Sequence, residues 1–135
     1  MRTIEPVLVR DLPLRPLVTV TPDASLRTAA GTMREQDVSA LVVGVAGSPV
    51  TILTERDVTI AMADGRDPAT LVAELATRRP LTVDHDATVE SAATQMLDEG
   101  VRHLVVVQAS RAVGLVSIRD LFAVVLKGVG PRSPR

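Results

Sequence analysis

The sequence has no cysteine, no tryptophan and no tyrosine, and Phe122 is its only aromatic residue. The absence of cysteine excludes disulfides, thiolate metal sites and thiol catalysis. The near absence of aromatic side chains removes the stacking platforms with which many proteins bind single-stranded nucleic acids. Fifteen basic residues stand against sixteen acidic ones, and the net charge of −1 gives no electrostatic case for nucleic acid or an anionic membrane as a partner.

Long apolar runs are also absent. No run approaches the roughly 20 apolar residues of a membrane-spanning helix, and residues 1–10 lack the apolar core of a signal peptide. With 46% hydrophobic and 23% charged residues, the 135-residue chain is too apolar for a disordered segment and long enough for one compact domain or two small units. We therefore expect a soluble, cytoplasmic protein. Fourteen of the fifteen basic residues are arginine, which hints at a GC-rich bacterial genome.

The chain contains an internal repeat at an offset of 63 positions. Residues 18–62 align with residues 81–125 without a gap, and fifteen of the 45 positions are identical. Alanine and valine account for many of the matches, but a Thr-Val pair, a methionine and an Arg-Asp pair also recur at the same offset. We interpret the pattern as a duplication, because self-similarity at one fixed period is typical of repeated structural units.

Each copy predicts the element order β-α-β-β-α, which makes the fold class α+β. In the first copy, strands are expected at residues 17–20, 41–45 and 50–53; in the second, at 81–83, 104–107 and 113–116. The first helix of each copy carries apolar residues at i, i+3, i+4 and i+7, and Asp23 or Asp86 precedes it as the expected N-cap. The last helix is expected to begin at Thr54 or Ser117 and to stop near a glycine, Gly65 or Gly128.

The repeat divides the chain into five expected segments: an N-terminal segment (1–16), a first repeat (17–66), a linker (67–80), a second repeat (81–128) and a disordered tail (129–135). Asp67 and Pro68 predict a linker helix that runs to about Ala76, with the aspartate as its cap. Residues 9–12 hold the equivalent place before the first copy. Because one copy is too small to bury its sheet alone, we expect the two to pack face to face around a pseudo-twofold axis.

The duplicated motifs resemble the CBS domain, and their tandem arrangement resembles a stand-alone CBS pair, or Bateman module. The resemblance covers roughly residues 7–127, and the residues that carry it are 18–26, 37–43 and 53–57 in the first copy and 81–89, 100–107 and 114–120 in the second. It implies a module that senses adenine nucleotides or related adenosyl ligands and that forms a homodimer.

In this family the phosphate and ribose motif is Gly-h-x-Ser/Thr-x-x-Asp, where h is apolar, and the second copy keeps it whole. A glycine at 114 would let a ligand approach the strand, a hydroxyl at 117 beside free helix N–H groups suits a phosphate, and a carboxylate at 120 can accept both hydroxyls of a ribose. The residues concerned are Gly114, Leu115, Ser117, Arg119 and Asp120. The alternative is a capping box, in which serine and aspartate only satisfy the start of the helix. The two roles are compatible.

The first copy departs from this motif. Thr51 replaces the glycine, and a β-branched side chain there would crowd a purine, although Thr54, Arg56 and Asp57 remain. Whether this second site is blocked stays open at the level of sequence.

The resemblance also implies that each site lies in a cleft between the copies and borrows residues from the other repeat. The Asp120 site then takes Val38, Ser39 and the chain near Arg15 from the first copy, together with His103 from the second. The Asp57 site takes Val101, Arg102 and the chain near Arg78. A histidine at position 103, where the family often has an arginine, would make a phosphate contact sensitive to pH. The alternative is a strand-end histidine that faces water.

Asp84, His85 and Asp86 form a run with the residue types of a metal site. We nevertheless predict no metal ligands, because consecutive residues are expected to point in different directions and Asp86 has a capping role. Neither histidine lies in a recognisable Ser/His/Asp context, so we predict no catalytic residues and no enzyme.

The function expected from the sequence is the sensing of an adenosine-containing metabolite. AMP, ADP, ATP and S-adenosylmethionine are the candidates, no cofactor is required, and occupancy is signalled through dimer packing or to an effector protein whose identity is unknown. A ligand-free pair that serves only for dimerisation is the first alternative. A small hydrolase that uses the Asp84 run and a dinucleotide-binding module are the others.

Overall fold

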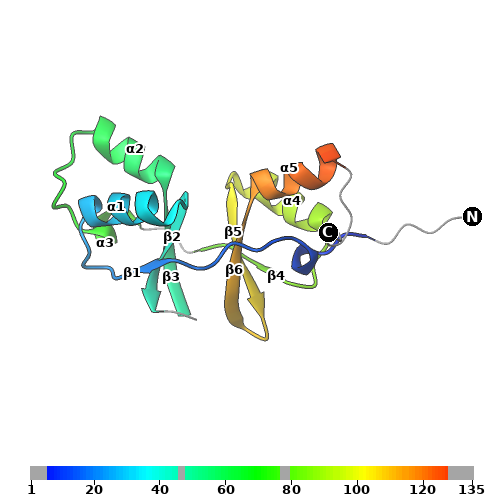
Figure 1. The fold of residues 1–135 in the computed structure, drawn as a ribbon. Helices are drawn as coiled ribbons and strands as arrows, with labels where there is room; N and C mark the ends of the chain where they lie inside the picture. The colour runs from blue at the N-terminus through cyan, green and yellow to red at the C-terminus, as the bar shows by residue number, and fades with distance from the viewer. Residues whose placement is uncertain (1–5, 46–47, 77–79, 128–135) are drawn as a thin grey trace, which may run out of the picture. The chain divides into compact units, whose positions relative to one another are not determined.

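The computed structural model describes residues 6–45, 48–76 and 80–127, which form two compact units (Figure 1). Unit 1 consists of Met1–Pro16 together with Leu81–Arg135, and unit 2 consists of Leu17–Pro80. The predicted tail at 129–135, Gly128 and Arg78 lie outside the described residues.

Unit 2 contains the first repeat. Its elements are β1 (Thr19–Val20), α1 (Leu26–Gln36), β2 (Ala40–Val45), β3 (Ser48–Thr54), α2 (Glu55–Ala63) and the short helix α3 (Val72–Leu75). The sheet has the order β1-β2-β3, with β1 parallel to β2 and β2 antiparallel to β3. Apolar side chains of β2 and β3, including Leu41 and Leu53, pack against Ala29 and Met33 of α1 and Val72 of α3.

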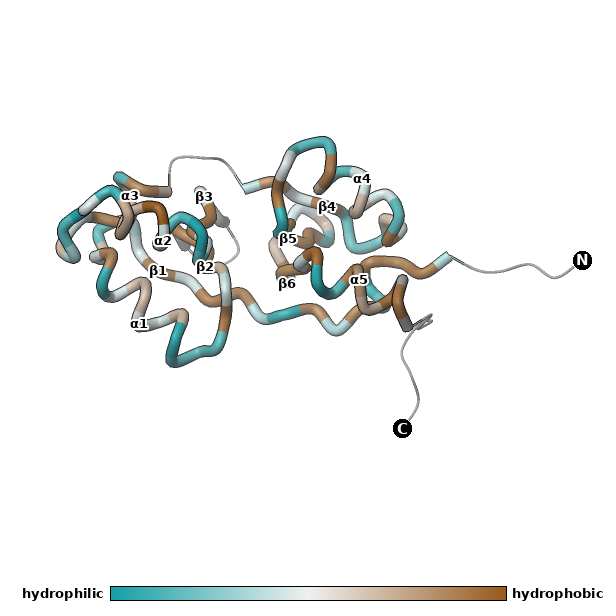
Figure 2. The backbone as a smooth tube through the Cα atoms, turned by 90° about the horizontal axis from the view of Figure 1, so that it is seen from above, coloured by the Kyte–Doolittle hydropathy of each residue, from teal (hydrophilic) through white to brown (hydrophobic). Residues whose placement is uncertain are grey.

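Unit 1 repeats this topology. It contains a 3-10 turn η1 (Val9–Asp11), then β4 (Thr82–Asp84), α4 (Val89–Glu99), β5 (His103–Gln108), β6 (Arg111–Ser117) and α5 (Ile118–Lys127). The sheet order is β4-β5-β6, with β4 parallel to β5 and β5 antiparallel to β6. Figure 2 shows the hydrophobic colouring of β5 and β6, whose buried residues form the core with α4, α5 and η1. The α+β class and the β-α-β-β-α order of each repeat are therefore confirmed.

Two local predictions about helix starts are wrong. The N-cap of α1 is Ser25 and that of α4 is Thr88, and their hydroxyls accept the N–H groups of Thr28 and Ser91, both at 3.0 Å. The expected caps Asp23 and Asp86 lie two residues too early. Serine and threonine are strong N-caps in their own right, so residue type alone did not decide between neighbouring candidates.

The linker helix is also shorter than the predicted run from Asp67 to Ala76. Its helical part is α3, Val72–Leu75, with Leu71 at the N-cap position. Asp67 instead accepts the N–H of Ala69 at 2.7 Å, which closes a turn around Pro68. Aspartate before proline favours both a helix start and a turn, and here it forms the turn.

The segment before each repeat packs on the other repeat. The N–H of Val9 donates to the carbonyl of Ala87 at 2.8 Å, and the N–H of Val72 donates to the carbonyl of Ala24 at 2.8 Å. Both valines are fully buried, and both bonds join positions that correspond at the 63-residue offset. Each compact unit therefore combines one repeat with the segment that precedes the other, so the folding units differ from the sequence repeats.

Within residues 6–45, 48–76 and 80–127, no helix combines the length and the apolar character needed to cross a bilayer.

Candidate ligand-binding site

The start of α5 brings Ser117 and Asp120 together in a reciprocal capping box. The serine hydroxyl oxygen accepts the Asp120 N–H at 3.3 Å, while Oδ2 of Asp120 accepts the Ser117 N–H at 2.9 Å and its hydroxyl at 3.1 Å. Ser117 is buried and the Asp120 side chain is 10% exposed. The capping interpretation is therefore correct in geometry, and both capping bonds that Asp120 accepts fall on one carboxylate oxygen, Oδ2.

The start of α2 has the same geometry in unit 2. Oδ2 of Asp57 accepts the Thr54 N–H at 2.8 Å and the Thr54 hydroxyl at 3.0 Å, and Thr54 caps the Asp57 N–H at 3.3 Å. Thr51, the residue in place of the motif glycine, is buried in β3 opposite Val43. Because both repeats contain the box, the box alone does not mark a ligand site, and the surroundings of each aspartate matter more.

Arg15 supplies a positive charge beside Asp120. Its backbone forms an antiparallel bridge to β6, in which the Arg15 N–H donates to the Leu115 carbonyl at 3.0 Å and the Leu115 N–H donates back at 2.9 Å. Its guanidinium Nη2 lies 3.2 Å from Oδ1 of Asp120, and Nε lies 3.4 Å from Oδ2. The structure thus brings Arg15 to Asp120 as expected, but Arg15 belongs by its contacts to the same unit as Asp120.

The structure gives a reason for the glycine at position 114 that the motif did not reveal. A Cβ built at this position would lie 3.0 Å from Leu14 Cβ and 3.2 Å from the Arg15 carbonyl oxygen. The missing side chain therefore admits the N-terminal segment where it crosses β6. In the described structure this glycine accommodates the protein's own backbone, whereas the sequence reasoning assigned that space to a ligand.

The remaining predicted residues of unit 1 lie around the start of α5. His103 is the first residue of β5 and pairs in register with Ser117, and the Arg102 carbonyl accepts the Ile118 N–H at 2.9 Å. Val101 packs against the core of the unit, and Arg119 is exposed in the first turn of α5. Together with Arg15, they surround a helix N-terminus, where the helix dipole favours an anion.

The counterparts in unit 2 occupy corresponding places around α2. The Ser39 carbonyl accepts the Glu55 N–H at 2.9 Å, Val38 packs against the core, and Arg56 is exposed in the first turn of the helix. Arg78, which corresponds to Arg15 at the repeat offset, lies outside the described residues.

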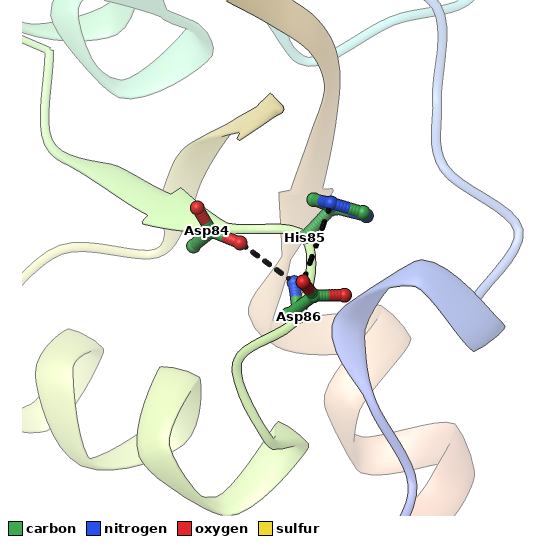
Figure 3. Close-up of side chains that lie close together, drawn as sticks. All are labelled: Asp84, His85 and Asp86. Carbon is green, nitrogen blue, oxygen red and sulfur yellow. Dashed lines mark hydrogen bonds and ion pairs between the residues drawn. The ribbon is translucent and has the colours of Figure 1, made fainter. Parts of the chain in front are cut away.

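Asp84, His85 and Asp86 lie closer together than expected (Figure 3). One possible ligand atom from each residue lies within 4.8 Å of the others, so the argument that consecutive side chains diverge is wrong here. Oδ1 of Asp84 accepts the Asp86 N–H at 2.9 Å, and Oδ2 of Asp86 lies 3.6 Å from His85 Nε2.

This run is attached to the N-terminal segment. Oδ1 of Asp86 pairs with Nη1 of Arg10 at 2.8 Å, and the Arg10 N–H donates to the His85 carbonyl at 2.9 Å. The run therefore holds the N-terminal segment on unit 1, in the same stretch of chain that delivers Arg15 to Asp120.

Sequence reasoning placed the chain near Arg15 at the Asp120 site but missed that the N-terminal segment packs on the second repeat. A signal was available, because the repeat continues upstream at the same offset: Leu8, Val9, Leu12 and Arg15 match Leu71, Val72, Leu75 and Arg78. That extension shows that the segment belongs to the repeated unit. It does not show on which copy the segment packs.

Comparison with known proteins establishes the family. A model of the CBS domain matches residues 9–64 and 72–127, so the chain belongs to the CBS domain family and carries two CBS domains. The CBS domain-containing protein YhcV of Bacillus subtilis is 30% identical over 114 residues, which cover 84% of this chain and 81% of that protein. An uncharacterized protein of Methanopyrus kandleri is 30% identical over 122 residues, which cover 87% of this chain but only 62% of that protein.

The fold is shared with solved structures of CBS domain proteins. A CBS domain protein from Pyrobaculum aerophilum, solved in complex with AMP, is 30% identical and superposes with a TM-score of 0.80. The superposition covers 90% of this chain and 97% of that chain.

Proposed function

We propose that this protein is a regulatory module that binds an adenine nucleotide or related adenosyl metabolite at the start of α5. The observation that carries the proposal is the pairing of a largely buried carboxylate, Asp120, with the Arg15 guanidinium at a helix N-terminus. The similar protein from Pyrobaculum aerophilum is complexed with AMP, which supports an adenosyl ligand for this chain. AMP, ADP, ATP and S-adenosylmethionine are the candidates.

The chemistry of the site suits a nucleotide in two ways. The Asp120 carboxylate accepts hydrogen bonds from the hydroxyls of a ribose, because an ionised carboxylate has acceptor positions beyond those used by the capping box. The helix dipole at the start of α5, with Arg15 and the exposed Arg119, favours a phosphate. These groups bind and orient a ligand, and we propose no catalytic step.

Regulation requires that the ligand prefers one state of the protein. A bound nucleotide shifts an equilibrium only by as much as its affinities for the two states differ. We propose that this shift is transmitted through packing within a homodimer or to an effector protein.

A ligand-free module that serves for dimerisation is the second candidate. The observation in its favour is that both Asp120 oxygens already accept hydrogen bonds from this chain: Oδ2 from Ser117 and Arg15, and Oδ1 from Arg15. In that case Asp120 stabilises the structure and needs no ligand.

The two functions are distinguished by a thermal-shift titration of AMP with matched variants. Asp120→Ala removes the proposed ribose acceptor and a helix cap, whereas Thr88→Ala removes the cap of α4 in the same unit and leaves the site intact. At 100 times its dissociation constant, AMP should stabilise the wild type by about 2.7 kcal/mol. The same gain is expected in Thr88→Ala and not in Asp120→Ala.

The remaining outcomes of this titration decide against the proposal. No stabilisation of the wild type by AMP, ADP, ATP or S-adenosylmethionine favours the ligand-free module. An equal gain in the wild type and in Asp120→Ala would show that a ligand binds elsewhere.

A further inference from the structure

The two oxygens of Asp120 differ in their contacts with Ser117. Oδ2 accepts the N–H and the hydroxyl of Ser117 and, at 3.4 Å, Arg15 Nε, while the closest partner of Oδ1 is Arg15 Nη2 at 3.2 Å. A ribose hydroxyl can therefore bind Oδ1 without opening the start of α5. Because the Asp120 side chain is only 10% exposed, a hydroxyl that reaches Oδ1 comes into competition with the Arg15 guanidinium.

We propose that Arg15 exchanges Asp120 for the phosphate of an incoming nucleotide, and that this exchange selects ligands with a phosphate over the corresponding neutral nucleosides. The inference rests on the proposed function and adds the class of ligand and the residue that discriminates it. Without a ligand, Arg15 is the counterion of Asp120; with a nucleotide bound, it contacts the phosphate.

Charge explains why the exchange favours ligands with a phosphate. A ribose diol is neutral, so it replaces the hydrogen bonds of Arg15 to Asp120 and leaves the guanidinium without an anion. A phosphate provides that anion, and hydrogen bonds between ionised partners are about twice as strong as neutral ones. A neutral nucleoside breaks the ion pair without this compensation, and S-adenosylmethionine brings a sulfonium where the nucleotide brings a phosphate.

The structure allows the guanidinium to move while the backbone stays in place. The Arg15 side chain is 49% exposed, and its bonds to Asp120 are long, at 3.2 and 3.4 Å. Its backbone is held by two hydrogen bonds to Leu115 and by the close crossing at Gly114. The guanidinium therefore remains tethered beside the helix N-terminus after Asp120 releases it.

The test compares AMP with adenosine by isothermal titration calorimetry on the wild type, Arg15→Gln and Arg10→Gln. Arg10 is the matched control, because it lies in the same segment and pairs with a different aspartate, Asp86, at 2.8 Å. We expect the wild type and Arg10→Gln to bind AMP at least about tenfold more tightly than adenosine, a typical value for one charged contact. In Arg15→Gln we expect a ratio of about threefold or less.

A second feature separates exchange from simple attraction of the phosphate. If Arg15 competes with the ribose for Asp120, Arg15→Gln loses affinity for AMP while its affinity for adenosine is unchanged or higher. Equal losses for both ligands would assign Arg15 a structural role and overturn the exchange. An unchanged ratio would also overturn it.

Failure of the exchange and failure of the proposed function give different results. A wild type that binds neither AMP nor adenosine refutes the proposed function and the exchange with it. A wild type that binds both, with a ratio that Arg15→Gln does not alter, refutes only the exchange. If Arg15→Gln does not fold, Arg15→Lys keeps the charge without the forked donors, and we expect an intermediate ratio.

Discussion

The packing of the N-terminal segment against β6 is tested by the substitution Gly114→Ala. The added Cβ would lie 3.0 Å from Leu14 Cβ and 3.2 Å from the Arg15 carbonyl oxygen. Carbon atoms in contact prefer about 3.5–4.0 Å, so β6 or the N-terminal segment must move by a few tenths of an ångström. Both contacted atoms belong to the backbone or lie next to it, and a change of side-chain rotamer cannot relieve the clash.

The expected cost follows from these contacts. Overpacking by one carbon typically costs about 1–3 kcal/mol. The displaced segment carries the two hydrogen bonds between Arg15 and Leu115, each contributing about 1 kcal/mol, and the half-exposed Arg15–Asp120 pair, which contributes about 1 kcal/mol or less. We therefore expect Gly114→Ala to lower the free energy of unfolding by about 1–3 kcal/mol.

Urea denaturation measures this loss, and Gly31→Ala is the matched control. Gly31 lies inside α1, and a Cβ there would meet no atom within 4 Å. Alanine should stabilise that helix by up to about 1 kcal/mol, because it has the higher helix propensity. If Gly114→Ala stays within about 0.5 kcal/mol of the wild type, the usual range of harmless surface changes, the close crossing does not constrain the segment and our reasoning is wrong.

Two further predictions concern the buried valine that precedes each repeat and the N-cap of α4. Val9→Ala and Val72→Ala should each lower the free energy of unfolding, measured by urea denaturation, by about 1.5–3 kcal/mol, because both valines are fully buried at equivalent places. If Val9→Ala lowers it by less than about 0.5 kcal/mol, the N-terminal segment does not belong to the fold. Thr88→Ala should cost about 1 kcal/mol because it removes the cap of α4. Asp86→Ala should cost less than about 1 kcal/mol, because its ion pair with Arg10 is exposed. If Asp86→Ala instead costs more than Thr88→Ala, Asp86 is the N-cap of α4 after all.

Much of each repeat was predictable from the sequence. The apolar runs that became β2 and β5 are continuous, and the apolar stripes of α1 and α4 have helical spacing, so element type and order followed from periodicity. The Ser117–Asp120 and Thr54–Asp57 capping boxes also followed, because the bonds are local and depend only on residue type and spacing.

The errors have local causes. Ser25 and Asp23, like Thr88 and Asp86, are all acceptable caps within two residues of each other, and only the backbone conformation selects between them. Asp67 and Pro68 favour a turn as strongly as a helix start, and here the turn formed. The expected divergence of Asp84, His85 and Asp86 holds for an extended strand, but β4 ends at Asp84 and the chain turns there.

By itself, the sequence determined the duplicated β-α-β-β-α order, the two helix N-termini with their acid and hydroxyl groups, and membership of the CBS domain family. These features depend on residue type and on spacing along the chain. The family resemblance placed the chain near Arg15 at the Asp120 site. Only the tertiary structure decided that the segment before the first repeat packs on the second, that Gly114 makes room for that segment, and that the Arg15 guanidinium contacts the carboxylate itself. These contacts join residues about a hundred positions apart, and either copy has a homologous surface that could accept the segment, so their partners are set by three-dimensional packing.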